Sequence, residues 1–172
     1  MMEAQALAGS SPKGEVTVAD GRFQVVFRRS YRKPITKVWA ALTIPERLAD
    51  WFGAAEVDGR VGGSLRIAFP DGAVIAMAVT RFEPPHVLGL SWRLDGIDTS
   101  VLFELAPSDD GCTLTLTHGG LDASGSGSGV RAGWHAHLDG LADSLDGRAT
   151  PWSVTTQRVA ALKPLYPSLR AG

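Results

Sequence analysis

Apolar and polar residues alternate near the start of the chain, from Val16 onward. One side of this segment carries Phe23, Val25 and Phe27, and the other carries Arg22, Gln24 and Arg28. This period of two predicts a half-buried β-strand. Residues 1–15 are rich in Ala, Gly, Ser and Pro and have no period, so we expect a flexible N-terminal tail there.

Two short helices are predicted next. Apolar residues recur at helical spacing at Ile35, Val38, Trp39 and Leu42. Pro34 suits the first turn of this helix. Pro45 interrupts the run and can begin a second short helix, which Gly53 ends.

From Gly53 to His118 the chain shows apolar strands separated by turn signals. The turns are Val61-Gly62-Gly63, Pro70-Asp71-Gly72, Pro84-Pro85, Asp95-Gly96 and Asp109-Asp110-Gly111. They delimit segments 64–69, 73–82, 87–94, 99–105 and 112–118, within a run of about six strands. Consecutive hairpins of this kind predict an antiparallel meander.

A Ser-Gly repeat at residues 123–129 predicts a flexible linker that is neither strand nor helix, either a solvated loop or a gate beside the helix that follows. That helix has one apolar stripe, formed by Val130, Trp134, Leu138, Leu141 and Leu145, and Gly147 is placed to end it. Residues 148–172 contain a short periodic piece broken by prolines. We expect this C-terminal extension to pack on the domain surface or on a partner.

These elements predict one α+β domain over residues 16–147 with a helix-grip fold, in the order β-α-α-β6-α. A curved antiparallel sheet with one apolar face must cover that face, and the long C-terminal helix is the only long element left to do so. One helix fills such a sheet incompletely. We therefore expect an internal cavity between the sheet and this helix.

Composition and the absence of known motifs exclude several classes of partner and cofactor. The 17 basic and 18 acidic side chains nearly balance and form no run of like charge, so we expect no nucleic-acid partner and no membrane partner. Cys112 is the only cysteine, which fits a reducing compartment, and no signal peptide or membrane helix is evident, so a cytoplasmic location is predicted. The sequence has no Walker loop, dinucleotide fingerprint or nucleophile elbow, and we expect no cofactor.

Several motifs occur in an order and spacing that cover about two thirds of the chain, from Arg32 to Gly147. They are residues 35–43 (ITKVWAALT), 45–52 (PERLADWF) and 61–66 (VGGSLR), then Gly133-Trp134, then residues 138–141 (LDGL). With them the chain resembles the SRPBCC or START-like superfamily, also called the birch-pollen-allergen fold. Within it, the chain resembles the family homologous to the activator of the heat-shock-protein-90 ATPase.

This resemblance implies a hydrophobic ligand cavity between sheet and helix, in a family whose members bind lipids, hormones or polyketides and occasionally catalyse cyclisation or hydration. Stimulation of an ATPase is not implied, because the chain has no room for a separate chaperone-docking domain. The motifs fix helix docking, a tight turn and helix packing, and none of them is a catalytic signature.

Two histidines are the candidate polar points of the cavity. Strand alternation aims His118 inward, and His137 lies at the edge of the apolar stripe of the long helix. Either they are satisfied core residues, or they orient a ligand oxygen, or they act as acid and base. No third ligand stands at a fixed spacing, so no metal site is predicted.

Aromatic and other apolar residues are candidate cavity walls: Trp39, Trp51, Phe52, Phe69, Met77, Trp92, Phe103 and Trp134. The leading hypothesis is therefore the binding of a hydrophobic or aromatic small molecule, with no catalytic residue assigned. One alternative is a cyclase- or hydratase-type enzyme that uses the cavity histidines. Another is a chaperone accessory or protein-interaction module, with the C-terminal extension as a candidate homodimer surface.

Overall fold

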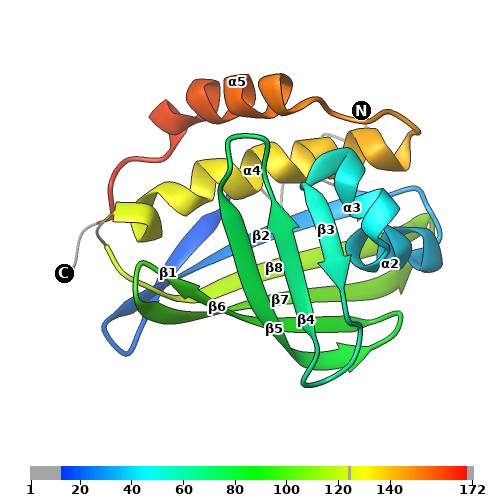
Figure 1. Ribbon diagram of the computed structural model, residues 1–172, viewed down its shortest axis with the longest axis horizontal. Helices are drawn as coiled ribbons and strands as arrows, with labels where there is room; N and C mark the ends of the chain where they lie inside the picture. The colour runs from blue at the N-terminus through cyan, green and yellow to red at the C-terminus, as the bar shows by residue number, and fades with distance from the viewer. Residues whose placement is uncertain (1–12, 124, 170–172) are drawn as a thin grey trace.

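The computed structural model describes residues 13–123 and 125–169 (Figure 1). Most of the predicted N-terminal tail lies outside these residues. The strands are β1 (Glu15–Ala19), β2 (Arg22–Tyr31), β3 (Ala54–Val57), β4 (Ser64–Ala68), β5 (Val74–Glu83), β6 (Val87–Leu94), β7 (Ile97–Ser108) and β8 (Gly111–Leu121). The helices are α2 (Ile35–Thr43), α3 (Pro45–Trp51), α4 (Gly125–Leu145) and α5 (Trp152–Leu162), followed by the 3-10 turn η1 (Lys163–Leu165).

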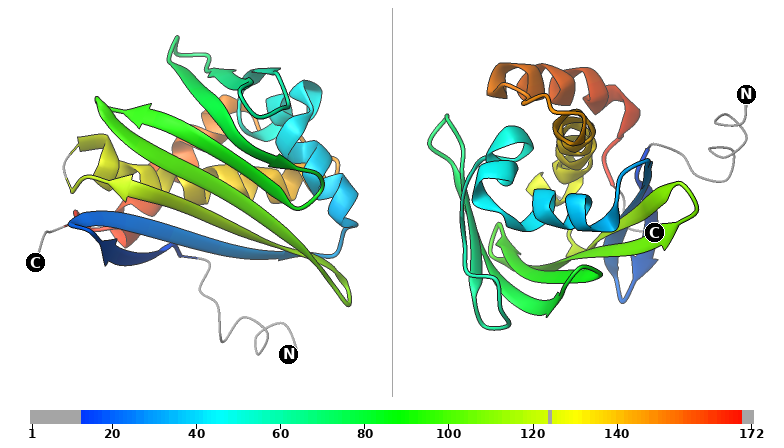
Figure 2. Two further views of the ribbon diagram at one scale, coloured as in Figure 1. Left: turned by 90° about the horizontal axis from the view of Figure 1, so that it is seen from below. Right: turned by 90° about the vertical axis from the view of Figure 1, so that its right-hand side faces the viewer.

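One antiparallel sheet organises the molecule, with the strand order β1-β2-β8-β7-β6-β5-β4-β3. The sheet curves around helix α4, and α5 lies on the side of α4 that faces away from the sheet (Figures 1 and 2). Helices α2 and α3 connect β2 to β3 and close one end of the curved sheet. The predicted helix-grip α+β fold is confirmed.

The N-terminal strand differs from the prediction, because the segment from Val16 is a hairpin rather than one strand. Asp20 and Gly21 form the turn, with φ angles of 54° and 73°. Two successive residues with positive φ are typical of the two-residue turns that match the twist of paired strands. Strand β1 therefore pairs with β2, with Val16 opposite Val25, and it forms one edge of the sheet.

The prediction of a flexible linker at residues 123–129 is wrong for its larger part, because helix α4 already begins at Gly125. Tertiary contacts outweigh the poor helix propensity of Gly and Ser here. A Cβ atom at Gly127 would collide with the backbone of Asp122, so this turn packs directly on the preceding chain. Ser128 accepts a hydrogen bond from the backbone N–H of Leu169 through its Oγ, which ties the turn to the C-terminal extension.

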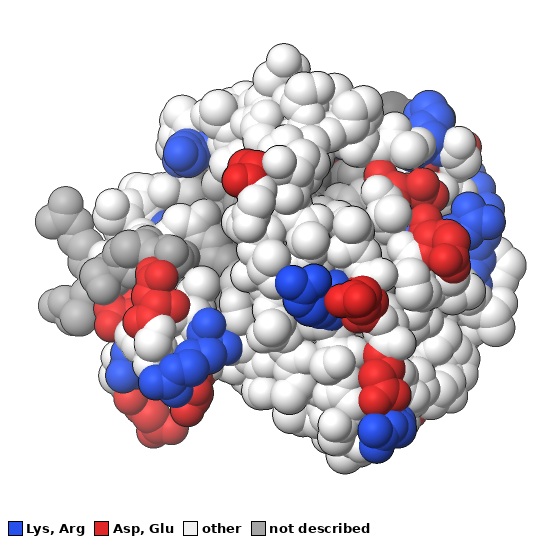
Figure 3. Space-filling model, viewed as in Figure 1, with Lys and Arg blue, Asp and Glu red and all other residues white. Residues whose placement is uncertain are grey.

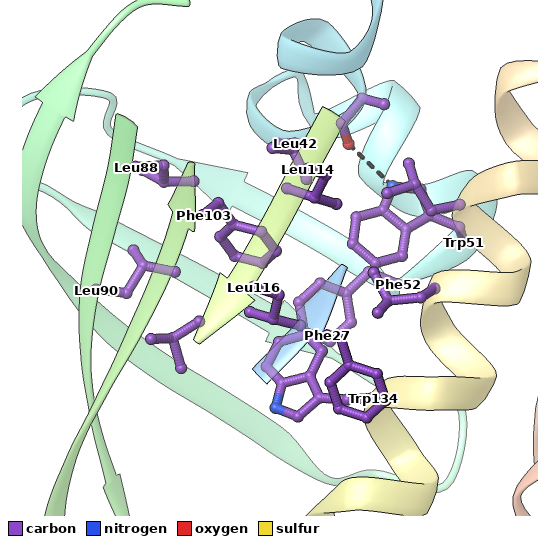
Figure 4. Packing of buried hydrophobic residues seen from close by; sticks show 14 of the residues in the cluster. Phe27, Leu42, Trp51, Phe52, Leu88, Leu90, Phe103, Leu114, Leu116 and Trp134 are labelled. Atoms are coloured by element: carbon purple, nitrogen blue, oxygen red, sulfur yellow. Dashed lines mark hydrogen bonds between the residues drawn. The ribbon is translucent and has the colours of Figure 1, made fainter. Parts of the chain in front are cut away.

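The space between the sheet and helix α4 is filled by side chains at the centre of the molecule. Figure 4 shows Phe27, Phe103 and Leu116 from the sheet, Phe52 next to α3 and Trp134 from α4 meeting there. Each is at most 6% exposed. Side chains this deeply buried pack against one another at the centre of the core.

The C-terminal extension packs against the outer side of helix α4. Arg158 of α5 donates to the carboxylate of Asp143 of α4 over 2.8 Å, and Thr150 donates to the same carboxylate. Farther along, the Tyr166 hydroxyl lies 2.7 Å from Nδ1 of His135 and accepts the backbone N–H of Gly14. Helix α4 is therefore buried on two opposite sides.

No helix in the described part of the chain is both long and apolar enough to cross a bilayer.

Candidate functional site

His118 lies at the centre of a buried hydrogen-bond chain. The indole N–H of Trp134 donates to Nδ1 of His118 over 2.9 Å, so Nε2 of the neutral ring carries the hydrogen. Nε2 donates to Oγ1 of Thr99 over 2.9 Å. The Thr99 hydroxyl in turn donates to the backbone carbonyl of Trp92 over 2.6 Å. Each polar side-chain atom in this series of hydrogen bonds therefore has a partner.

The surroundings of His118 keep it neutral and inaccessible. Its side chain is 0% exposed, and the Trp92 ring stacks on it with centroids 5.1 Å apart. Burial lowers the pKa of His118 to about 4, because charging the imidazole would cost its hydration. Both ring nitrogens are already engaged, so His118 is arranged as a satisfied core residue, the first of the readings that the sequence left open.

The other residues predicted as cavity walls lie in three separate places. Phe103 packs edge-on against Trp134, and Met77 pairs with Trp92 across strands β5 and β6. Trp39 lies apart from them and contacts Phe82 of β5. The remaining predicted residues, Trp51, Phe52, Phe69 and His137, come together at the end of the sheet that α3 covers.

A pocket of about 510 Å³ opens at this end, which we call the end pocket. It lies between α3, the strands β3 and β4, and the start of α5. Its main lining residues are Trp51, Phe52, Gly53, Ala68, Phe69, Pro70, Thr150, Pro151, Trp152 and Thr155. Its volume falls within the range of about 300–1,000 Å³ that is usual for small-molecule sites.

Close backbone approaches form the end pocket. A Cβ atom at Gly53 would lie 2.6 Å from the side chain of Ile67, so only glycine allows the chain to leave α3 this close to the sheet. The indole N–H of Trp51 donates to the carbonyl of Ala41, which fixes the ring (Figure 4). On the opposite wall, the backbone N–H of Thr150 donates to the carbonyl of Asp50 over 2.8 Å. This bond attaches the start of α5 to α3.

His137 stands among the aromatic rings of the end pocket. Its ring centroid lies 5.0 Å from that of Phe52, 6.1 Å from Phe69, and 6.5 Å from both Trp51 and Trp152. Nδ1 lies 3.1 Å from the carbonyl oxygen of Trp51, which can only accept, so Nδ1 carries a hydrogen and donates it. Burial lowers the pKa of His137, and the hydrogen bond to Trp51 opposes this shift in part.

The lining of the end pocket carries no charge. None of its lining residues is Asp, Glu, Lys or Arg, and its polar side chains are the hydroxyls of Thr150 and Thr155. Figure 3 shows the same side of the molecule as Figure 1, and most of its surface is free of charged residues. Uncharged aromatic walls favour a ligand with an apolar body.

No metal site is formed by the described residues, since no three His, Cys, Asp or Glu side chains lie close enough together to hold an ion. His135, which points away from the predicted stripe, is buried by the extension and engaged by Tyr166.

Sequence reasoning missed the contribution of α5 to the site. Trp152 closes one wall of the end pocket and lies 5.1 Å from Phe69, ring centroid to ring centroid. The sequence placed this tryptophan in an extension without an assigned position. The one available signal was the Pro151-Trp152 pair, since proline often precedes or opens a helix and a large aromatic side chain there needs a surface to pack on.

Comparisons with known proteins found one matching family and several solved structures of similar fold. The sequence profile described as Activator of Hsp90 ATPase homolog 1-like protein matches residues 32–146. Among solved structures, CalU16 from Micromonospora echinospora is 28% identical, with a TM-score of 0.67, and the match covers 90% of this chain and 99% of CalU16. Protein MLL2253 from Mesorhizobium loti is 26% identical, with a TM-score of 0.68, over 72% of this chain and 97% of that protein.

A third solved structure is DynU16, a protein of the dynemicin biosynthetic locus. It is 30% identical, with a TM-score of 0.67, and the match covers 76% of this chain and 49% of DynU16.

Proposed function

The chain belongs to the Activator of Hsp90 ATPase homolog 1-like protein family, and we propose that it binds a hydrophobic or aromatic small molecule in the end pocket. The observation that carries this proposal is the set of four aromatic rings around an uncharged pocket of about 510 Å³. Trp51, Phe52, Phe69 and Trp152 supply these rings. Trp51 and Phe52 are only 2% and 6% exposed, so the half-buried Phe69 and Trp152 offer most of the aromatic surface that a ligand can reach.

The fold and the relatives support the same proposal. The helix-grip architecture is a ligand-binding fold, and the end pocket lies between α3, the strands β3 and β4, and the start of α5. The similarity to DynU16, a protein of the dynemicin biosynthetic locus, also supports a small-molecule ligand, because a biosynthetic locus acts on small molecules.

The arrangement gives less support to an acid–base enzyme centred on His118. General acid–base catalysis needs a side chain within hydrogen-bond reach of the substrate. His118 is fully buried and uses both ring nitrogens inside the protein. His137 packs against rings that line the end pocket but is not itself one of the lining residues, so no acid–base role in that pocket is assigned to it.

Titration with 2-methoxynaphthalene, followed by tryptophan fluorescence and calorimetry, tests the proposal. We expect saturable binding that Trp152→Ala weakens by about tenfold or more, because a stacked aromatic wall is lost. Trp39→Ala is the matched control, since Trp39 is also half-buried but packs on Phe82 and does not line the end pocket. Absence of saturable binding to the wild-type protein, or equal losses in the two folded variants, contradicts the proposal.

A further inference from the structure

Thr155 of helix α5 gives the end pocket a hydroxyl that no described residue engages. We infer that the ligand is an aromatic molecule with an uncharged polar substituent, a hydroxyl or a carbonyl, that hydrogen-bonds to Oγ1 of Thr155. Thr155 then determines which aromatic compounds bind most tightly. This inference rests on the proposed function, because it concerns the ligand of the same pocket.

Two threonine hydroxyls line the end pocket, and their partners differ. The hydroxyl of Thr150 donates to the carboxylate of Asp143 over 3.3 Å. Thr155 is bonded through its backbone N–H, which donates to the carbonyl of Pro151 over 3.1 Å. Its hydroxyl has no hydrogen-bond partner among the described residues, so both its hydrogen and its lone pairs are available.

The accessible surface of the Thr155 hydroxyl faces the end pocket. Thr155 is only 3% exposed, yet Oγ1 is not one of the fully buried polar atoms that lack a partner in the described part of the chain. Oγ1 therefore keeps some accessible surface, and because Thr155 lines the pocket, that surface opens into it. Polar groups of residues this deeply buried usually have a partner, and here a ligand group in the pocket can supply it.

The position of Thr155 on helix α5 determines where the polar substituent of the ligand lies. Thr155 follows Trp152 by three residues, and side chains at this spacing are neighbours on one face of a helix. Both residues line the pocket, where the half-buried Trp152 offers aromatic surface. A ligand that stacks on Trp152 therefore has an edge within reach of the Thr155 hydroxyl.

The charge of the pocket lining explains why the substituent is uncharged. The lining residues include no cation that could balance a carboxylate or phosphate and no anion that could balance an ammonium group. The carboxylate of Asp143, which Thr150 contacts, is already paired with Arg148 and Arg158. Transfer of an unpaired charge from water into such an apolar site is costly, so a hydroxyl or a carbonyl is favoured.

A pair of probes and a set of threonine variants test the inference. The probes 2-naphthol and 2-methylnaphthalene have the same rings, but only 2-naphthol has a polar substituent. Thr155→Val replaces the hydroxyl with a methyl group, and we expect it to lower the affinity for 2-naphthol relative to 2-methylnaphthalene by about two- to tenfold, the ratio that one net hydrogen bond provides. Thr155→Ser should restore the wild-type ratio. Thr156→Val is the control, because Thr156 is exposed, donates to the carbonyl of Ser153 and does not line the pocket.

Urea unfolding separates this binding role from a structural one. Thr155→Val should be at least as stable as the wild-type protein, because the hydroxyl has no partner among the described residues to lose. A clear loss of stability in Thr155→Val shows that the hydroxyl supports the fold, and it overturns the inference. An unchanged affinity ratio in this variant, with both probes still bound, overturns the inference and leaves the proposed function intact. Failure of both probes to bind the wild-type protein overturns the proposed function, and the inference with it.

Discussion

The buried His118 makes the stability of the fold depend on pH. In the unfolded chain its imidazole titrates near its ordinary pKa of 6.5, whereas burial lowers the pKa in the folded protein to about 4. The unfolded state therefore binds a proton between these two values that the native state does not. The free energy of unfolding accordingly falls as the pH drops from 6.5 to 4 and is not reduced further by this group below pH 4.

The size of this effect follows from the two pKa values. At 1.36 kcal/mol per pH unit, full protonation of the unfolded state costs about 3 kcal/mol of stability, and about 2 kcal/mol of this is lost between pH 7.5 and pH 5. With a urea dependence of about 2 kcal/mol per M, the unfolding midpoint shifts by about 1 M. Burial also lowers the pKa values of His135 and His137, which adds a loss of the same sign.

A difference measurement isolates His118 from these groups. Urea unfolding of the wild-type protein and of His118→Gln is compared at pH 7.5 and pH 5; glutamine retains one donor and one acceptor but does not titrate. The variant is expected to be less stable at pH 7.5 and to lose about 2 kcal/mol less than the wild type on acidification. His86→Gln, at an exposed position, serves as the control and should follow the wild type. Equal losses in wild type and His118→Gln refute the reasoning.

Two further pairs of substitutions test the packing at helix α4 by urea unfolding. Gly127→Ala should destabilise the protein by about 1–3 kcal/mol, because the new Cβ collides with the backbone of Asp122. Gly129→Ala has open space around the new Cβ and should stabilise the protein by about 0.5–1 kcal/mol, because alanine favours a helix more than glycine does. Losses of equal size in the two variants contradict a packed start of helix α4. Tyr166→Phe should cost about 1–3 kcal/mol, because it removes the hydroxyl that joins Gly14 to His135. In contrast, Tyr31→Phe should be close to neutral, since the buried Tyr31 hydroxyl has no partner among the described residues; the opposite order contradicts the assignment.

Local sequence patterns were sufficient to predict most of the helices and strands. Helices α2 and α3 begin and end near the proline and glycine signals around residues 34, 45 and 53. The strands from β4 to β8 follow the predicted turns. Such signals act through backbone geometry within a few residues, so they are readable without knowledge of the fold. Strand β3 has only four residues, which is too few for an alternating pattern to be recognised in the sequence. These residues form a strand because they pair with β4.

The Ser-Gly segment shows where local reasoning fails. Its composition disfavours a helix, yet residues from Gly125 onward are helical because Gly127 packs on Asp122 and Ser128 bonds to Leu169. Neither contact is visible from the segment itself. A bond such as that from Leu169 links residues more than forty positions apart in the chain.

The sequence by itself determined the architecture of this protein, its inward-facing residues and the aromatic character of its candidate site. Periodicity and turn residues act locally, and burial of one apolar sheet face leaves few ways to arrange one long helix. The tertiary structure alone decided which candidates meet: both ring nitrogens of His118 are hydrogen-bonded, to Trp134 and Thr99, whereas His137 packs against rings that line the end pocket, Trp152 among them. Alternation and helical spacing state which face a side chain occupies, but only packing in three dimensions determines its partners.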